Sequence, residues 1–280
     1  MNNKTVPVRH LADLTIKINQ IAKDAGKIIL EIYNSEFAVE QKDDKSPLTA
    51  ADLASHQLIC KELKELMPDI PVLSEESSTT PYTTRAQWQQ YWLVDPLDGT
   101  REFIKRNGEF TVNIALIENN EPVIGVVYVP VTGVIYYASN NNGAWKQTGD
   151  EKPDQIHTRK TNPDKIAVAG SRSHASERQL AFFEKLGKAE VFSIGSSLKF
   201  CLVAEGIVDI YPRFGLTSEW DTAAAQCVVK EAGGQVTDEE FKVLAYNTKE
   251  SLLNPNFLVI ADPGFDWKPY LKETVTNNQA

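Results

Sequence analysis

The sequence predicts an α+β protein in two halves, a mostly antiparallel sheet with two long helices followed by an α/β half. Helical periodicity runs through the first part of the chain, and short apolar runs separated by turn residues follow it. From about residue 166 onward, strand-like and helix-like segments alternate. A charged segment with two prolines, Gly149–Asp164, lies between these two sequence patterns and predicts a domain boundary. We therefore expect an N-terminal domain at 1–160 and a C-terminal domain at 161–280.

Two helices are predicted at the start of the chain. Apolar residues recur at steps of three and four, which predicts an amphipathic helix at about 10–33. A second helix is predicted at about 49–67, where Pro68 ends it, and the charged, turn-prone stretch 40–47 connects the two. Core packing explains the apolar stripe of the first helix most simply, and contact with a membrane surface is the alternative.

The middle of the chain predicts strands joined by turns. The short apolar runs predict strands at 72–74, 91–94, 112–117, 123–129 and 134–138. The polar stretch 77–90 predicts a loop with a short helix near 85–90. The run Asn140-Asn141-Asn142-Gly143 predicts a tight turn.

The second half predicts alternating strands and helices. Strands are expected near 166–169, 191–192, 209–211, 235–237 and 257–260. Helices are expected at about 176–186, 197–205 and 222–232. Gly233-Gly234 closes the last of these helices, and the tail after Leu271 is expected to fray.

Composition is that of an ordinary globular protein, and it limits the choice of ligands. Hydrophobic residues make up 42% and charged residues 24%, which excludes disordered, collagen-like and coiled-coil chains. The formal net charge is −9, from 29 basic and 38 acidic residues, and it argues against general affinity for nucleic acid. An anionic ligand would need a local reversal of sign, from clustered Lys or Arg, helix N-termini or bound cations.

Cysteine usage and the lack of targeting features predict a cytoplasmic protein. Cys60, Cys201 and Cys227 form no CxxC pair and have apolar neighbours, so we expect buried free thiols in a reducing compartment. The N-terminus lacks the apolar stretch of a signal peptide, and the longest near-apolar run, 123–131, is too short to span a membrane. Peripheral association with the cytoplasmic face of an inner membrane stays open as an alternative. No stable protein partner is implied.

The most informative segment is Asp95-Pro96-Leu97-Asp98-Gly99-Thr100, directly after an apolar strand. Pro96 and Gly99 predict a turn there, with two carboxylates on one side and a carbonyl between them. Such a turn can bind a hard cation. An Asx turn with solvated carboxylates is the alternative interpretation.

Three further acidic positions have structural explanations of their own. Glu75-Glu76 follows a strand and could be an exposed charged turn. Asp221 follows Trp220 at a predicted helix start, where a carboxylate is favoured by the helix dipole. Thr49 and Asp52 have the spacing of a capping box. Each acid is ordinary alone, and only their combination is specific.

That ordered combination, Thr-Ala-Ala-Asp, Ser-Glu-Glu, Asp-Pro-Leu-Asp-Gly-Thr and Trp-Asp, resembles the inositol-monophosphatase superfamily of Mg²⁺-dependent, lithium-sensitive phosphatases. The runs DPLDGTREF, GSSLKFC and YPRFG are similar to those of bacterial 3′(2′),5′-bisphosphate nucleotidases of the CysQ type. Simple inositol monophosphatases typically carry Thr-Asn-Phe after DGT and lack the Ser-Ser-Leu-Lys segment. The similarity covers about 18–260 and implies a layered α-β-α-β-α sandwich.

The resemblance also implies a role for individual residues. It implies two or three Mg²⁺ ions held by Glu75, Asp95, the Leu97 carbonyl, Asp98 and Asp221. It implies that Asp52 and Thr100 hold and deprotonate the attacking water. It also implies that the substrate contacts Glu75, Leu97, Asp98 and Asp221. Gly99 and Thr100 would contact the phosphate that is removed. The nucleotide would contact Ser171, His174, Ser196 and Lys199, and a second phosphate would contact Arg213. Most metal ligands would then lie in the N-terminal half, and the nucleotide contacts in the C-terminal half.

What the resemblance implies for function is removal of the 3′-phosphate from adenosine 3′,5′-bisphosphate, giving AMP. The sulfated form, 3′-phosphoadenylyl sulfate, would be a further substrate, with a link to sulfate assimilation. The alternatives are a phosphatase of inositol phosphate or fructose 1,6-bisphosphate, a non-catalytic sensor of the nucleotide, and a general anion- or RNA-binding module, which the net charge disfavours. Two positions depart from the pattern: Arg101 stands where Lys is frequent, and Ala225 where many relatives have Gly, which leaves fine specificity open.

Overall fold

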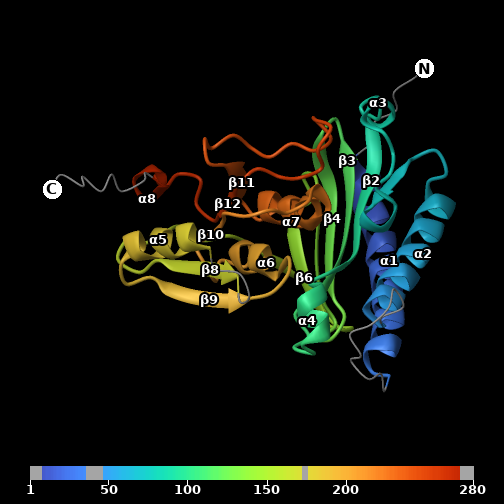
Figure 1. Cartoon of the computed structure of the whole chain (residues 1–280), viewed down its shortest axis with the longest axis horizontal. Helices are drawn as coiled ribbons and strands as arrows, with labels where there is room; N and C mark the ends of the chain where they lie inside the picture. Colours follow the sequence, from blue (N-terminus) through green and yellow to red (C-terminus); the bar gives the residue numbers. More distant parts are fainter. Residues whose placement is uncertain (1–7, 36–46, 172–175, 272–280) are drawn as a thin grey trace.

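The computed structural model describes residues 8–35, 47–171 and 176–271, and its helices and sheets stack in the order helix, sheet, helix, sheet, helix (Figure 1). The expected α-β-α-β-α sandwich is therefore confirmed. Most of the predicted connection at 40–47, the tail after Leu271, and His174 lie outside the described residues.

The outermost helices, α1 (Val8–Tyr33) and α2 (Pro47–Leu66), pack against each other and against one face of the first sheet (Figure 1). The apolar stripe of α1 is buried in this core and consists of Leu11, Leu14, Ile18, Ile21, Ala25 and Ile29. The stripe is therefore a packing surface, as core packing predicts, and is not turned toward a membrane. In the part of the chain that the structure describes, no helix is long and apolar enough to cross a membrane.

The first sheet follows the order of the chain, so neighbours in sequence are neighbours in space. Its strands are β1 (Val72–Ser74), β2 (Gln90–Asp98), β3 (Thr111–Glu118), β4 (Glu121–Val129), β5 (Val134–Ser139), β6 (Ala144–Thr148) and β7 (Asp154–Ile156). Only β1 and β2 pair in parallel. Trp92 and Val94 face the outer helices while Tyr91 and Leu93 face the opposite core. Both faces of β2 are covered, which explains its unbroken apolar run.

Two helices separate this sheet from the second one: α6 (Leu198–Ala204) and α7 (Glu219–Glu231). The second sheet has the order β11-β12-β10-β8-β9, from β8 (Ala167–Ser171), β9 (Glu190–Ile194), β10 (Ile210–Arg213), β11 (Gln235–Asp238) and β12 (Phe257–Ile260). Its far face carries α5 (Glu177–Leu186) and α8 (Lys268–Leu271). The sheets divide the chain between 156 and 167, and the two-domain division at 160 stays a prediction.

Several short elements differ from the sequence-based expectations. The turn-joined strands β6 and β7 carry few apolar residues and were not expected; β7 lies inside the predicted boundary segment. The structure also contains η1 (Glu75–Ser77), α3 (Tyr82–Arg85) and α4 (Thr100–Ile104). The helix expected near 85–90 is wrong, because α3 ends at Arg85 and Gln90 opens β2. Cys201 and Cys227 are buried as expected, but Cys60 is only half-buried on α2.

The close approach of α7 to β4 generates a stability prediction. A Cβ added at Gly125 would lie 2.1 Å from the carbonyl oxygen of Ala224 and 2.7 Å from Cβ of Cys227. Overpacking of this kind costs about 1–3 kcal/mol, so Gly125→Ala should lower the free energy of unfolding by about that amount in urea denaturation. Gly215→Ala is the control, since its Cβ would meet no atom closer than 4.0 Å. Equal stability of the two variants would contradict this packing.

Candidate active site

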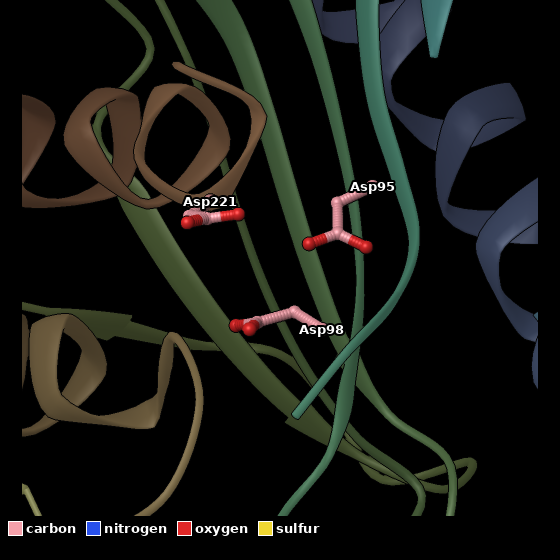
Figure 2. A group of neighbouring side chains, drawn as sticks. All are labelled: Asp95, Asp98 and Asp221. Carbon is pink, nitrogen blue, oxygen red and sulfur yellow. The ribbon is translucent and has the colours of Figure 1, made fainter. Parts of the chain in front are cut away.

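Three aspartates from distant parts of the chain converge between the two sheets. Asp95 and Asp98 come from the end of β2, and Asp221 comes from the first turn of α7. Each offers a carboxylate oxygen, and these oxygens all lie within 4.8 Å of one another. Figure 2 shows the three side chains directed into one space between β2 and α7. We call these residues the acid cluster.

The end of β2 is held by contacts from within and from α2. The backbone N–H of Leu97 donates to Oδ1 of Asp95 at 3.1 Å, which is an Asx turn. The hydroxyl of Ser55, on α2, donates to the carbonyl of Pro96 at 2.9 Å. The Asx turn proposed as the alternative is therefore present, but its carboxylate is buried, with Asp95 only 1% exposed. β2 also continues to Asp98, so this Asx turn is an irregularity inside the strand, where the pairing with β3 shifts register between Asp95 and Asp98, and it does not follow the strand.

Asp221 combines a helix-start role with membership of the acid cluster. Helix α7 begins at Glu219, three residues before its predicted start, and Ser218 precedes it as the N-cap. The N–H of Ser218 donates to Oδ2 of Asp221 at 2.8 Å. The interpretation of Asp221 as a helix-terminal carboxylate is thus correct without excluding a ligand role.

Burial and mutual repulsion make the acid cluster costly to ionise. Burial, followed by the charge of Asp98, raises the pKa of Asp95 well above its ordinary value. The same two causes raise the pKa of Asp221 to about 8. A bound cation would relieve both effects, and an all-oxygen donor set suits a hard divalent ion such as Mg²⁺. The residues of the acid cluster therefore fit the metal that the resemblance implies.

Glu75 lies beside the acid cluster but is not one of its three members. Its carboxyl group hydrogen-bonds with the side chains of Asp95 and Trp220, and its pKa is raised by desolvation and by the charge of Asp98. The hydroxyl oxygen of Ser74, the preceding residue, lies 2.9 Å from Nδ1 of His56. Helix α2 thus contacts the residue directly before Glu75 and the residue directly after Asp95.

Asp52 faces the same acids from α2. The helix begins at Pro47, so Thr49 is not its N-cap and the predicted capping box is wrong. Asp52 is buried, and its Oδ1 has no hydrogen-bond partner within the described part of the chain. Burial, then the charges of Glu76 and Glu75, raise the pKa of Asp52 to about 8. An unpartnered, basic carboxylate oxygen is suited to accept a proton.

A cavity opens beside the acid cluster and brings together most of the predicted substrate contacts. Its lining includes Asp98, Gly99, Ser196, Lys199, Arg213 and Asp221. Thr100, the first residue of α4, is exposed next to Gly99, and Ser171 ends β8. Ala225 is 1% exposed in the core between the sheets and is absent from the cavity lining given by the described residues.

Gly99 is required by the wall of this cavity. Its φ is +95°, in the left-handed region that favours glycine. A Cβ here would lie 3.1 Å from the carbonyl oxygen of Glu109 and 3.1 Å from Cβ of Ser196. The glycine therefore allows the start of α4 to approach the segment before α6.

The two cationic residues of the cavity have different surroundings. Lys199 is buried, and its ammonium group donates to the carbonyls of Ser196 at 2.6 Å and Ile194 at 3.3 Å. Burial lowers the pKa of Lys199 to about 8. Arg213 donates from Nη2 to the carbonyl of Leu216 at 3.1 Å, and its buried Nε has no partner among the described residues. Lys199 therefore shapes the segment 194–196, while Arg213 lines the cavity with its guanidinium group.

The sequence-based reasoning did not identify three buried polar residues behind the acid cluster. Ser197 hydrogen-bonds to Asp98, and Asn113 and Thr111 of β3 form the next contacts. The only signal in the sequence was the second serine of Ser-Ser-Leu-Lys, whose partner on β3, Asn113, is 84 positions away.

Comparison with known proteins gives consistent matches over nearly the whole chain. A model of the inositol monophosphatase family matches residues 10–276. The 3′(2′),5′-bisphosphate nucleotidase CysQ of Salmonella typhimurium is 51% identical over 245 residues, covering 87% of this chain and 98% of that protein. The protein of the same name from Haemophilus influenzae is 40% identical over 251 residues, covering 89% of this chain and 93% of that protein. Among solved structures, CysQ from Bacteroides thetaiotaomicron has a TM-score of 0.82 at 42% identity, covering 89% of this chain and 97% of its own.

The pKa directions in the acid cluster predict how stability depends on pH and on Mg²⁺. An aspartate whose pKa is raised by folding contributes stability that is fully present below its ordinary pKa of 3.8 and lost as the pH rises through about 8. The metal-free protein should therefore lose free energy of unfolding between about pH 4 and about pH 8, and Mg²⁺ should restore it, by about 2.7 kcal/mol at 100 times its Kd.

Urea denaturation in EDTA and in Mg²⁺ measures both effects. Asp221→Asn should weaken the pH dependence and the stabilisation by Mg²⁺, while Asp150→Asn, at an exposed position, should change neither. A Mg²⁺ effect that survives unchanged in Asp221→Asn would contradict the assignment of the cation to the acid cluster.

Proposed function

The chain belongs to the inositol monophosphatase family, and we propose that it is a Mg²⁺-dependent 3′(2′),5′-bisphosphate nucleotidase. Its reaction is hydrolysis of the 3′-phosphate of adenosine 3′,5′-bisphosphate to AMP and phosphate. The high identity to proteins named as such nucleotidases, over most of their length, supports this choice within the family.

The observation that carries the proposal is the placement of Arg213 in the same cavity as Asp98 and Asp221. A substrate with two separate phosphates fits such a cavity, because one phosphate can lie at the cation-binding acids and the other at the guanidinium group. Arg binds phosphate well through its planar set of N–H donors. A phosphate monoester of inositol offers only one such group, so it would leave Arg213 unused.

The metal site is assigned to the acid cluster, with Glu75 and the carbonyl of Leu97 as further ligands for two or three ions. When bound, Mg²⁺ supplies positive charge that makes the attacking water more acidic and offsets charge on the phosphate and leaving oxygen. This local charge lets a chain of net charge −9 bind a highly anionic nucleotide.

The chain's own groups orient the water and the substrate, and one of them accepts the proton. Asp52, with its unpartnered Oδ1, accepts the proton of the water that Asp52 and Thr100 hold. The backbone N–H groups of Gly99 and Thr100 donate to the phosphate being attacked. The nucleotide contacts are Ser171, His174, Ser196 and Lys199; because Lys199 already donates to the carbonyl of Ser196, it also shapes the wall that the nucleotide meets.

Two extensions of this proposal concern substrate range and biological role. The sulfated nucleotide 3′-phosphoadenylyl sulfate carries the same 3′-phosphate, so we include it as a second substrate. Activity on either nucleotide would connect the enzyme to sulfate assimilation. The expected ligand is in both cases a small molecule, acted on in the cytoplasm.

Phosphate release is the first test. With Mg²⁺, the purified protein should release phosphate from adenosine 3′,5′-bisphosphate much faster than from inositol 1-phosphate, and Li⁺ should inhibit the release. Asp98→Asn should lower kcat about a hundredfold or more, because a ligand of the cation is lost. Preference for the inositol ester would overturn the nucleotide assignment, and no release from either would favour the sensor alternative.

Arg213 gives a sharper test of the second phosphate. Arg213→Met should lower kcat/KM for adenosine 3′,5′-bisphosphate about tenfold or more, the size expected for a lost hydrogen bond to a charged group. The effect on adenosine 3′-monophosphate, which lacks the 5′-phosphate, should be small. Arg178→Met, which removes an arginine paired with Glu239 outside this cavity, is the matched control. Equal losses on both substrates would contradict the role of Arg213.

A further inference from the structure

Ser197 occupies the point where the two halves of the acid cluster meet. Its backbone N–H and its hydroxyl group both approach Oδ2 of Asp98, at 2.7 Å and 3.0 Å. The same hydroxyl lies 2.9 Å from the backbone carbonyl oxygen of Asp221. A single residue, 2% exposed, therefore contacts one acid from β2 and one from α7.

The hydroxyl of Ser197 is oriented from behind by β3. The side-chain amide of Asn113 donates to Oγ of Ser197 at 3.0 Å, so the single hydroxyl proton is directed toward Asp98 or Asp221. Asn113 is itself fixed, because its Oδ1 accepts from the hydroxyl of Thr111 at 3.0 Å. Thr111 and Asn113 are 0% and 1% exposed, so these contacts form a buried polar network that leads to the acid cluster.

Two local features indicate that this arrangement is not simply a helix cap. Ser197 is the N-cap of α6, a position where serine is favoured because its side chain can accept from the helix N–H groups. In the described structure its side chain makes no such bond. The preceding residue, Ser196, has φ +48°, a conformation that costs a residue with a Cβ about 1 kcal/mol or more. The chain accepts this conformation where Ser197 presents its N–H to Asp98.

We propose that Ser197, oriented by Asn113, is a positioning residue for the cation site. The N–H of Ser197 holds Oδ2 of Asp98 and leaves the other carboxylate oxygen for the cation. The hydroxyl proton is shared between that Oδ2 and the Asp221 carbonyl, which keeps the start of α7 close to Asp98. The proposal rests on the proposed function only in taking the acid cluster as a Mg²⁺ site, and it is independent of the nucleotide.

The test measures Mg²⁺ binding without substrate. Ser197→Ala should weaken the Mg²⁺ affinity measured by isothermal titration about tenfold, the lower end of what is expected for one lost hydrogen bond to a carboxylate. The Mg²⁺ concentration for half-maximal phosphate release should rise by the same factor, while KM for adenosine 3′,5′-bisphosphate at saturating Mg²⁺ changes less than twofold. Ser197→Thr, which keeps the hydroxyl, should retain most of the affinity.

Ser139 provides a matched control for loss of a buried serine. It is 3% exposed and its Oγ accepts from the side-chain amide of Asn142 at 3.1 Å, as Ser197 accepts from Asn113. Ser139→Ala should lower thermal stability without changing Mg²⁺ affinity. Native Mg²⁺ affinity in Ser197→Ala, or an equal loss in Ser139→Ala, would overturn the proposal.

Asn113 supplies a second, independent variant. Asn113→Ala leaves the hydroxyl of Ser197 present but no longer oriented, so it should weaken Mg²⁺ binding by a smaller factor, and it keeps the test open if Ser197→Ala does not fold. In the double variant, removal of Asn113 should have no further effect on Mg²⁺ affinity. Fully additive losses would show that the two residues act separately and would refute the positioning by Asn113. Because titration needs no turnover, the outcome stands whether or not the nucleotide is hydrolysed.

Discussion

Repulsion between closely spaced carboxylates, of which Asp95 is fully buried, is the constraint on which this structure depends. Three aspartate oxygens lie within 4.8 Å of one another, and the raised pKa values of Asp95 and Asp221 reflect the resulting cost of ionisation. The fold holds each carboxylate with local donors, namely the N–H of Leu97 at Asp95, the N–H and hydroxyl of Ser197 at Asp98, and the N–H of Ser218 at Asp221. Such donors orient a carboxylate without removing its charge, so the charge stays available to a cation.

The layer of helices between the sheets makes this convergence possible. Asp221 can lie near β2 only because α7 packs closely on the first sheet. The carbonyl of Ala224 occupies the space above Gly125 where a Cβ would otherwise lie. The small residues of α7, Ala223, Ala224 and Ala225, are at most 1% exposed in the core that both sheets share. Ala225 is thus explained by packing, and its methyl group has no place in the cavity wall that the described residues form.

The sequence was most informative where the burial pattern is long and uninterrupted. The extent of α1 agrees with its prediction because the apolar spacing over many turns indicates which face is buried. The bounds of β1 also agree, although this strand has only three residues. β2 extends beyond its predicted end because the missing N–H of Pro96 is tolerated there. Pro96 lies past Val94, the last residue of β2 that pairs with β1. It also lies in the stretch where the pairing of β2 with β3 is irregular. The polar strands β6 and β7 carry no apolar periodicity from which they could be identified. Contacts such as that between Asn113 and Ser197 depend on tertiary placement and have no local signature.

At the acidic residues, a structural role and a metal-ligand role are compatible, because a carboxylate has two oxygens. At Asp95 one oxygen closes an Asx turn, and at Asp221 one oxygen receives the N–H of the helix cap, so the structural interpretation of each residue is correct. That local bond fixes the rotamer and thereby directs the other oxygen, which is the property a metal ligand requires. Asp52 is the contrasting case: its predicted capping role fails, and Oδ1 has no partner in the described residues. A carboxylate that exchanges a proton must have a lone pair without a hydrogen-bond donor, and Oδ1 of Asp52 meets this condition. Asp95 and Asp221, which would bind the cation, do not exchange a proton and have no such requirement.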